Sequence, residues 1–145
     1  MEITVINLQK KVAVCQEKIK KIIRAALRLE RVRKAGEITV SLVTDGAIRE
    51  LNTLYLGRYC ATDVISFDVS RAKNELIADI AISADTALSN AKKYRTSPWF
   101  EIYLYVIHGL LHVLGYDDVN QKKRKKMQER TEFILTSLKI KRYGD

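Results

Sequence analysis

The chain has 145 residues, of which 47% are hydrophobic, enough for one compact domain with its own core. It lacks the run of about 18 apolar residues that a membrane-spanning helix needs, and its N-terminus lacks the pattern of a signal peptide. Its two cysteines, Cys15 and Cys60, are too few for a disulfide framework. We therefore expect one domain over residues 1–145, with free thiols, in the cytoplasm.

The net charge of +9 is unevenly distributed. Residues 1–34 carry +7, residues 35–120 carry −4 and residues 121–145 carry +6, with histidine counted as neutral. Basic segments on both sides of a more acidic centre are typical of proteins that bind nucleic acid through its phosphates. Solvated helix faces, or the charge-rich surface of a heat-adapted protein, would give the same pattern.

The N-terminal part of the chain predicts a strand followed by a basic helix. Apolar and polar residues alternate over residues 2–8, which indicates the strand. Apolar residues then recur at helical spacing from about 12 to 34, and most charged residues lie off that stripe. The cations of this helix that we expect to contact a nucleic acid are Lys20, Arg24 and Arg28.

The middle of the chain alternates between predicted strands and helices. These are a strand over 37–43, a short helix over 47–55, strands over 62–67 and 76–82, and a helix from Ser83 to about Tyr94. Thr44 or Asp45 is the expected N-cap of the short helix, and Ser83 that of the next. The third and fourth strands are close enough in sequence to form a hairpin.

Two further helices are predicted in the C-terminal part. The first begins at Ser97-Pro98, a cap followed by proline, and is apolar on almost every side to Leu114, so it should be the central helix of the fold. The second covers about 119–138, and the tail 139–145 should be frayed. The second helix opens with a basic run whose candidate nucleic-acid contacts are Lys122, Lys123 and Arg124.

These elements predict an α+β domain with a single mixed sheet of about four strands and about five helices. Hydrophobic periodicity leaves the strand order of this sheet open.

Both histidines of the chain, His108 and His112, lie on the apolar helix. A spacing of four residues places the rings on one helix face, with Cβ atoms roughly 5–6 Å apart. Gly115 can end the helix in a left-handed conformation, and a turn there would bring Asp118 back towards the imidazoles. Two imidazoles and one carboxylate with a free fourth position are typical of a catalytic zinc. Two buried, hydrogen-bonded histidines are the alternative.

The frame H-x-x-x-H-x-x-G-x-x-D shares its spacing with one group of zinc proteases, H-E-x-x-H-x-x-G-x-x-H. Those enzymes need the glutamate after the first histidine as general base. Gly109 occupies that position here and has no group that can accept a proton. Peptide hydrolysis by that mechanism is therefore not expected.

Two stretches of the chain form a distinctive combination. One is Leu51-Asn52 with 61–67 (Ala-Thr-Asp-Val-Ile-Ser-Phe), and the other is 78–83 (Ala-Asp-Ile-Ala-Ile-Ser) leading to 108–117. In this order and spacing they resemble the bacterial YbeY family of endoribonucleases. The resemblance implies a mixed sheet with a helical layer, a single zinc ion held by three histidines, and single-stranded RNA as substrate. It also implies a role in 16S rRNA 3′-end maturation and ribosome quality control on the small subunit, in the cytoplasm.

The chain departs from the family pattern at the third ligand. The family motif ends Gly-Tyr-Asp-His, whereas this chain has Asp118 at the last position, so His108, His112 and Asp118 are the expected ligands. A carboxylate oxygen is an accepted zinc ligand, and it makes Mn²⁺ or another divalent ion more competitive. We expect one divalent metal per chain, zinc first. A surface aspartate in a degraded site is the alternative.

A second departure concerns an arginine. The family has a functionally important arginine in a Tyr-Arg-Gly context before the third strand, and the matching position here is Leu56. Arg58, two residues later, is the candidate catalytic substitute, because a guanidinium can hold a phosphate through two hydrogen bonds. An ordinary exposed loop arginine is the alternative.

The sequence therefore predicts a metal-dependent endoribonuclease, a hydrolase of phosphodiester bonds. Two other functions stay open. One is a non-catalytic factor that binds rRNA or the ribosome with an impaired metal site, and the other is a zinc hydrolase of a small molecule.

Overall fold

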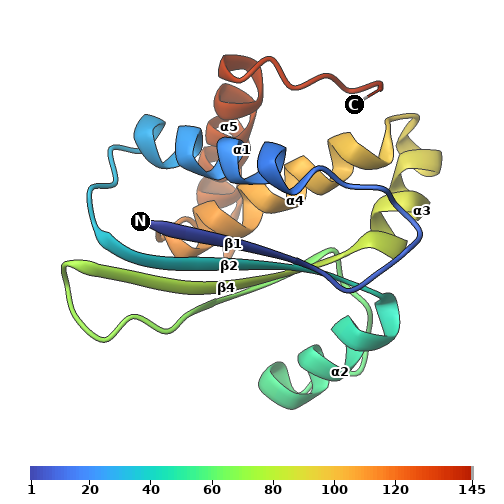
Figure 1. The fold of residues 1–145 in the computed structure, drawn as a ribbon, viewed down its shortest axis with the longest axis horizontal. Helices are drawn as coiled ribbons and strands as arrows, with labels where there is room; N and C mark the ends of the chain where they lie inside the picture. The colour runs from blue at the N-terminus through green and yellow to red at the C-terminus, as the bar shows by residue number, and fades with distance from the viewer. Residues whose placement is uncertain (145) are drawn as a thin grey trace.

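The computed structural model describes residues 1–144, which form a four-stranded mixed sheet and five helices (Figure 1). The elements in chain order are β1 (Glu2–Asn7), α1 (Gln16–Leu29), β2 (Ala35–Val43), α2 (Asp45–Leu56), β3 (Val64–Asp68), β4 (Glu75–Ser83), α3 (Ala84–Tyr94), α4 (Pro98–Val113) and α5 (Gln121–Ser137). The predicted α+β class and mixed sheet are confirmed.

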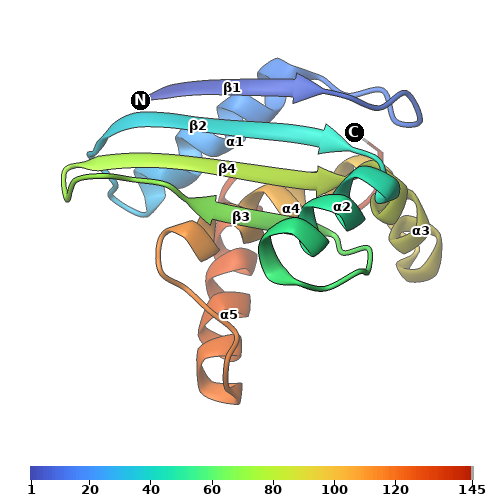
Figure 2. The same cartoon turned by 90° about the horizontal axis from the view of Figure 1, so that it is seen from below.

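The sheet has the strand order β1-β2-β4-β3, which Figure 2 shows from the face that α2 covers. β1, β2 and β4 are parallel, and β3 runs antiparallel to β4, so the predicted hairpin of the third and fourth strands is present. Alternate residues of β2 and β4 face the helices and are buried, namely Ile38, Val40, Leu42, Leu76, Ala78, Ile80 and Ile82.

Helix α4 is the centre of the core, as its composition predicted. It lies with α1 on one face of the sheet and contacts α1, α3, α5, β3 and β4 (Figures 1 and 2). Ile102, Val106 and Ile107 of α4 are completely buried. A smaller apolar cluster around Val43, Ile48 and Ile65 holds α2 to the opposite face.

Four of the helices have an N-cap residue whose side chain accepts a hydrogen bond from the first turn. Thr44, Ser83, Ser97 and Asn120 accept hydrogen bonds from the backbone N–H groups of the first turns of α2, α3, α4 and α5, at 2.8–3.3 Å. The expected caps Thr44 and Ser83 are therefore confirmed.

Helix α1 is shorter than the predicted 12–34. The Gln9 side chain folds residues 9–12 into a turn, because its Oε1 accepts from the backbone N–H groups of Lys11 and Val12 at 2.9 Å. At the other end, Arg31 has φ +57°, a left-handed conformation that stops the helix.

The prediction that the tail is frayed is wrong for residues 139–144, and Asp145 lies outside the described residues. The backbone N–H of Ser97 donates to the Arg142 carbonyl at 2.8 Å, and Ser97 Oγ donates to the Gly144 carbonyl at 2.7 Å. The Arg142 guanidinium lies 5.3 Å from the centre of the Phe100 ring. These contacts fasten the tail to the N-terminus of α4.

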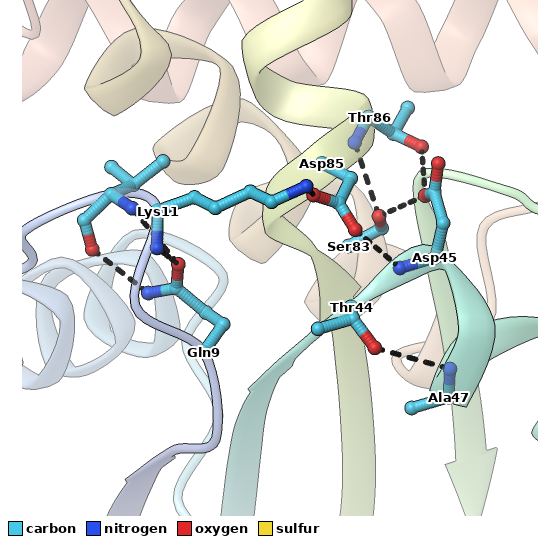
Figure 3. A network of polar contacts seen from close by, with 9 residues as sticks. Gln9, Lys11, Thr44, Asp45, Ala47, Ser83, Asp85 and Thr86 are labelled. Carbon is cyan, nitrogen blue, oxygen red and sulfur yellow. Dashed lines mark hydrogen bonds and ion pairs between the residues drawn. The ribbon is translucent and has the colours of Figure 1, made fainter.

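A polar network joins the ends of β2 and β4 to the loop after β1 (Figure 3). Lys11 Nζ lies 2.6 Å from Asp85 Oδ1, and Asp85 Oδ2 accepts from the backbone N–H of Asp45 at 2.8 Å. Asp45 in turn accepts from the hydroxyls of Ser83 and Thr86. The network holds the N-termini of α2 and α3 together.

Within residues 1–144, no helix is both long and apolar enough to cross a membrane.

Candidate active site

The two histidines lie on the C-terminal half of α4, where the sequence placed them. His108 is half-buried and His112, one turn later, is exposed. Gly115 then turns the chain with φ +106°, and its N–H donates to the His112 carbonyl at 3.1 Å. The glycine therefore ends the helix in the left-handed conformation that was predicted.

A cavity of about 480 Å³ opens beside His108. His108 and Tyr105 of α4 form one side of it, Arg124 of α5 another, and Asp63 and Asp118 come from the loops before β3 and before α5. The remaining lining residues are Leu104, Met127, Gln128, Thr131 and Glu132. His112 is not among the lining residues, so the structure brings His108 and Asp118 to one cavity and leaves His112 beside it.

The side chains of His108, His112 and Asp118 are of the chemical types that bind a divalent metal, because imidazoles and carboxylates are ordinary zinc ligands. Within residues 1–144 neither imidazole has a protein hydrogen-bond partner. No three His, Cys, Asp or Glu side chains of the described residues are grouped closely enough to hold one metal ion. The ligand set His108, His112 and Asp118 therefore stays a prediction.

The packing around Gly109 explains why glycine, and not glutamate, follows the first histidine of the frame. The residue faces the sheet, and a Cβ built on it would lie 2.9 Å from Ile80 Cγ2 and Ser66 Oγ and 3.0 Å from Val64 Cγ2. Ser66 Oγ also donates to the Gly109 carbonyl at 3.1 Å. A larger side chain would push α4 away from β3 and β4, so glycine here serves the packing of the helix that carries both histidines.

Tyr105 is held as a neutral phenol at the wall of the cavity. Its hydroxyl accepts from Asn90 Nδ2 at 2.8 Å and donates to Glu101 Oε1 at 3.3 Å, and Thr96 donates to the other Glu101 oxygen. Burial raises the pKa of Tyr105 far above its ordinary value. The hydroxyl therefore stays neutral near neutral pH, is committed to Asn90 and Glu101, and cannot act as a base.

Asp63 is a carboxylate of the cavity that the sequence analysis did not select as a site residue. Its Oδ1 accepts from the backbone N–H of Val64 at 2.8 Å and from the Thr62 hydroxyl, and its backbone carbonyl accepts from the N–H of Ser83. These bonds fix the residue at the start of β3. The Thr-Asp-Val stretch that contains Asp63 was the one feature of the sequence that could have indicated it as a site residue.

The loop that carries Asp118 is held by its neighbours in sequence. Asp117 Oδ1 accepts from the backbone N–H of Val119 at 3.2 Å, and Lys123 Nζ lies 3.6 Å from Asp117 Oδ2. The Tyr116 ring packs on the core, and burial next to Glu30 raises the pKa of its hydroxyl. Asp118 itself is exposed.

Comparison with known proteins gives the family. The family model described as Endoribonuclease YbeY matches residues 4–139. The chain belongs to the YbeY family. It is similar to an Endoribonuclease YbeY of Carboxydothermus hydrogenoformans, with 35% identity over 94% of this chain and 96% of that protein. It is also similar to one of Syntrophus aciditrophicus, with 38% identity over 83% of this chain and 78% of that protein.

A solution structure from Thermotoga maritima supports the same fold. It has a TM-score of 0.61 and 23% identity and covers 94% of this chain and 91% of its own. The predicted YbeY resemblance is confirmed by the family model and the two relatives.

The candidate catalytic arginine of this YbeY-family chain is exposed and is not among the residues that line the His108 cavity. The backbone N–H of Arg58 donates to the Asn52 carbonyl at 3.3 Å at the end of α2. The buried Asn52 side chain donates to the Cys60 carbonyl at 3.0 Å and so holds the loop that follows. Arg124, by contrast, lines the cavity together with His108 and Asp118. The catalytic role of Arg58 stays a prediction.

The other predicted RNA-binding cations lie on two surfaces. Lys122, Lys123 and Arg124 are exposed in the first turn of α5, and of these three only Arg124 lines the His108 cavity. Arg24 and Arg28 line a different cavity beside α1, whereas Lys20 lies outside its lining and 3.5 Å from Glu17.

Proposed function

We propose that this chain is a metal-dependent endoribonuclease that cleaves single-stranded RNA in the cavity beside His108. The observation that carries the proposal is the match to the YbeY family over residues 4–139, together with the cavity in which Asp63 meets His108 and Asp118. The proposed cellular role is 16S rRNA 3′-end maturation and ribosome quality control on the small subunit, in the cytoplasm.

His108, His112 and Asp118 would hold the metal, with zinc as the first expectation. When bound, the metal would supply a Lewis acid for a phosphoryl oxygen and lower the pKa of a water molecule. The exposed position of Asp118 on the turn after Gly115 leaves this carboxylate free to approach the imidazoles.

The chain's own residues would bind and orient the RNA. Arg124, at the cavity wall, can hold the non-bridging oxygens of the scissile phosphate through two hydrogen bonds and stabilise the charge that develops on them. Asp63, fixed at the start of β3, offers a carboxylate that can accept a proton from the attacking hydroxyl or water.

The test is cleavage of a single-stranded RNA by His108→Ala protein purified free of host ribonucleases. Cleavage should be lost, while Lys73→Ala, an exposed cation outside the cavity, should cleave like the wild type. Asp63→Asn and Arg124→Gln should each reduce kcat by roughly 10²-fold or more, the range for a positioned acid–base or charge-stabilising group. Undiminished cleavage by His108→Ala would rule out this site.

A second function, a non-catalytic factor that binds rRNA, is favoured by one observation. Within residues 1–144 the three expected ligands do not form a cluster able to hold a metal. This function predicts RNA binding with steep salt dependence but no stoichiometric metal. Elemental analysis of protein purified without chelators or affinity metals distinguishes the two, since the endoribonuclease should contain about one divalent ion per chain.

A further inference from the structure

A second cavity, of about 520 Å³, lies between α1 and the segment after α5. We call it the α1 groove. Six of its lining residues are cations, and no Asp or Glu is among the described lining residues. The cations are Lys18, Lys21, Arg24, Arg28, Lys139 and Lys141. The α1 groove shares no lining residue with the His108 cavity.

The charges of the α1 groove come from two distant parts of the chain. Helix α1 buries Ile19 and Ile23 completely in the core and contributes four of the groove's cations, which line it next to Ile22. The segment that carries Lys139 and Lys141 is held nearby, because the backbone N–H of Ile140 donates to the Leu135 carbonyl at 3.0 Å. Cations held close together repel one another, and a bound anion between them would offset that repulsion, so this convergence favours a polyanionic ligand over two independently solvated surfaces.

The remaining lining of the α1 groove suits phosphates better than bases. It consists of Ile22, Ala25, Leu138, Ile140 and Tyr103. The Tyr103 ring is 2% exposed, with Lys18 Nζ 5.0 Å from its centre, so it offers no stacking surface. Among residues 1–144, no amide or carboxylate side chain that could pair with a base edge lines the groove. Lysine and arginine can bind the phosphate backbone, and contacts of that kind do not read sequence.

We propose that the α1 groove binds the phosphodiester backbone of the RNA substrate away from the scissile bond and anchors the strand without sequence preference. This inference rests on the proposed RNA substrate of the His108 cavity. It assigns Lys139 and Lys141 a binding role that the sequence did not indicate, and it excludes Lys20 from the α1 groove.

The test replaces three exposed cations of the α1 groove in the full chain, as R24Q/R28Q/K141Q. Lys139 is left unchanged because its backbone is left-handed, with φ +53°. The matched control, R71Q/K73Q/K92Q, also removes three exposed cations, all outside the α1 groove. Both sets are made in His108→Ala protein, so that binding of intact RNA is measured whether or not the chain cleaves it.

Binding of U-only and A-only oligonucleotides is followed by fluorescence anisotropy between 50 and 200 mM salt. For a single strand each lost phosphate contact lowers the log–log salt slope by about 0.7, so three lower it by about 2 and weaken binding roughly a hundredfold at 0.1 M salt. Both oligonucleotides should lose affinity equally. The control variant should lose markedly less.

Two outcomes overturn the inference. One is a groove variant that binds both RNAs like the control variant, which makes the cations a solvated surface. The other is tight binding of inorganic triphosphate that competes fully with RNA and disappears in the groove variant, which makes this a small-polyphosphate site. Absence of cleavage by the wild type would instead count against the proposed catalytic function and would leave the binding result intact.

Discussion

The Gly109→Ala substitution tests how closely α4 must approach the sheet. The added methyl group would lie 2.9–3.0 Å from atoms of Ile80, Ser66 and Val64, where ordinary contacts begin at about 3.4 Å. Two of these neighbours are β-branched residues of β3 and β4, which cannot rotate away without cost. The helix or the strands must therefore shift by several tenths of an ångström.

The expected free-energy change combines two opposing effects. Overpacking of a tight core costs about 2–3 kcal/mol for neighbours this rigid, and the better helix propensity of alanine returns about 1 kcal/mol. We expect a net loss of about 1–2 kcal/mol, which corresponds to a melting temperature about 2–8 °C lower in a chain of this length. RNA cleavage should fall as well, because α4 carries both histidines.

The measurement is urea unfolding followed by circular dichroism, with Gly46→Ala as the matched control. Gly46 lies in the first turn of α2, and a Cβ there would meet only Thr44 Oγ1 at 3.9 Å. That substitution should be neutral or stabilising by up to about 1 kcal/mol, because it restricts the unfolded chain. Equal stability of the two variants would refute the close packing of α4 on the sheet.

Three further predictions concern charged groups. Arg130→Ala should lower the free energy of unfolding in urea by about 1–3 kcal/mol. The reason is that Arg130 Nε lies 2.6 Å from Glu30, whose side chain is only 6% exposed and would lose this partner. A change below about 0.5 kcal/mol, as for surface ion pairs, would contradict this prediction. Lys11 and the Asp45 backbone N–H hold the pKa of Asp85 below its ordinary value. The Asp85→Asn variant should therefore be less stable than the wild type at pH 7. This difference in the free energy of unfolding should close as the pH falls below about 4, because the wild-type carboxylate then protonates. A gap that stays constant from pH 7 to pH 3 would show that the charge of Asp85 is not what stabilises the network. Asp118→Ala should weaken zinc binding, measured by chelator competition, by at least the roughly tenfold that loss of an outer-shell partner causes; unchanged affinity would remove Asp118 from the ligand set.

The sequence predicted each helix and strand that the structure contains, because most of them have a strong apolar periodicity and a recognisable cap. It was less accurate where a side-chain hydrogen bond, rather than an apolar periodicity, sets the boundary. Helix α1 starts late because of a turn built on Gln9, and the tail is ordered by hydrogen bonds to Ser97, which lies more than forty residues earlier. Neither signal is an apolar periodicity, so the pattern that predicted the other elements missed both.

For the candidate site, too, the sequence predicted one part and only the structure showed the rest. The sequence alone determined the family, the histidine pair on one helix face and the glycine that ends that helix, since these depend on short spacings within one segment. Only the tertiary structure placed Arg124 and Asp63 beside His108, left Arg58 outside that cavity, and joined α1 to Lys139 and Lys141 in one basic groove. The physical reason is that packing of the helices on the sheet brings together residues far apart in the chain, and no local pattern encodes those distances.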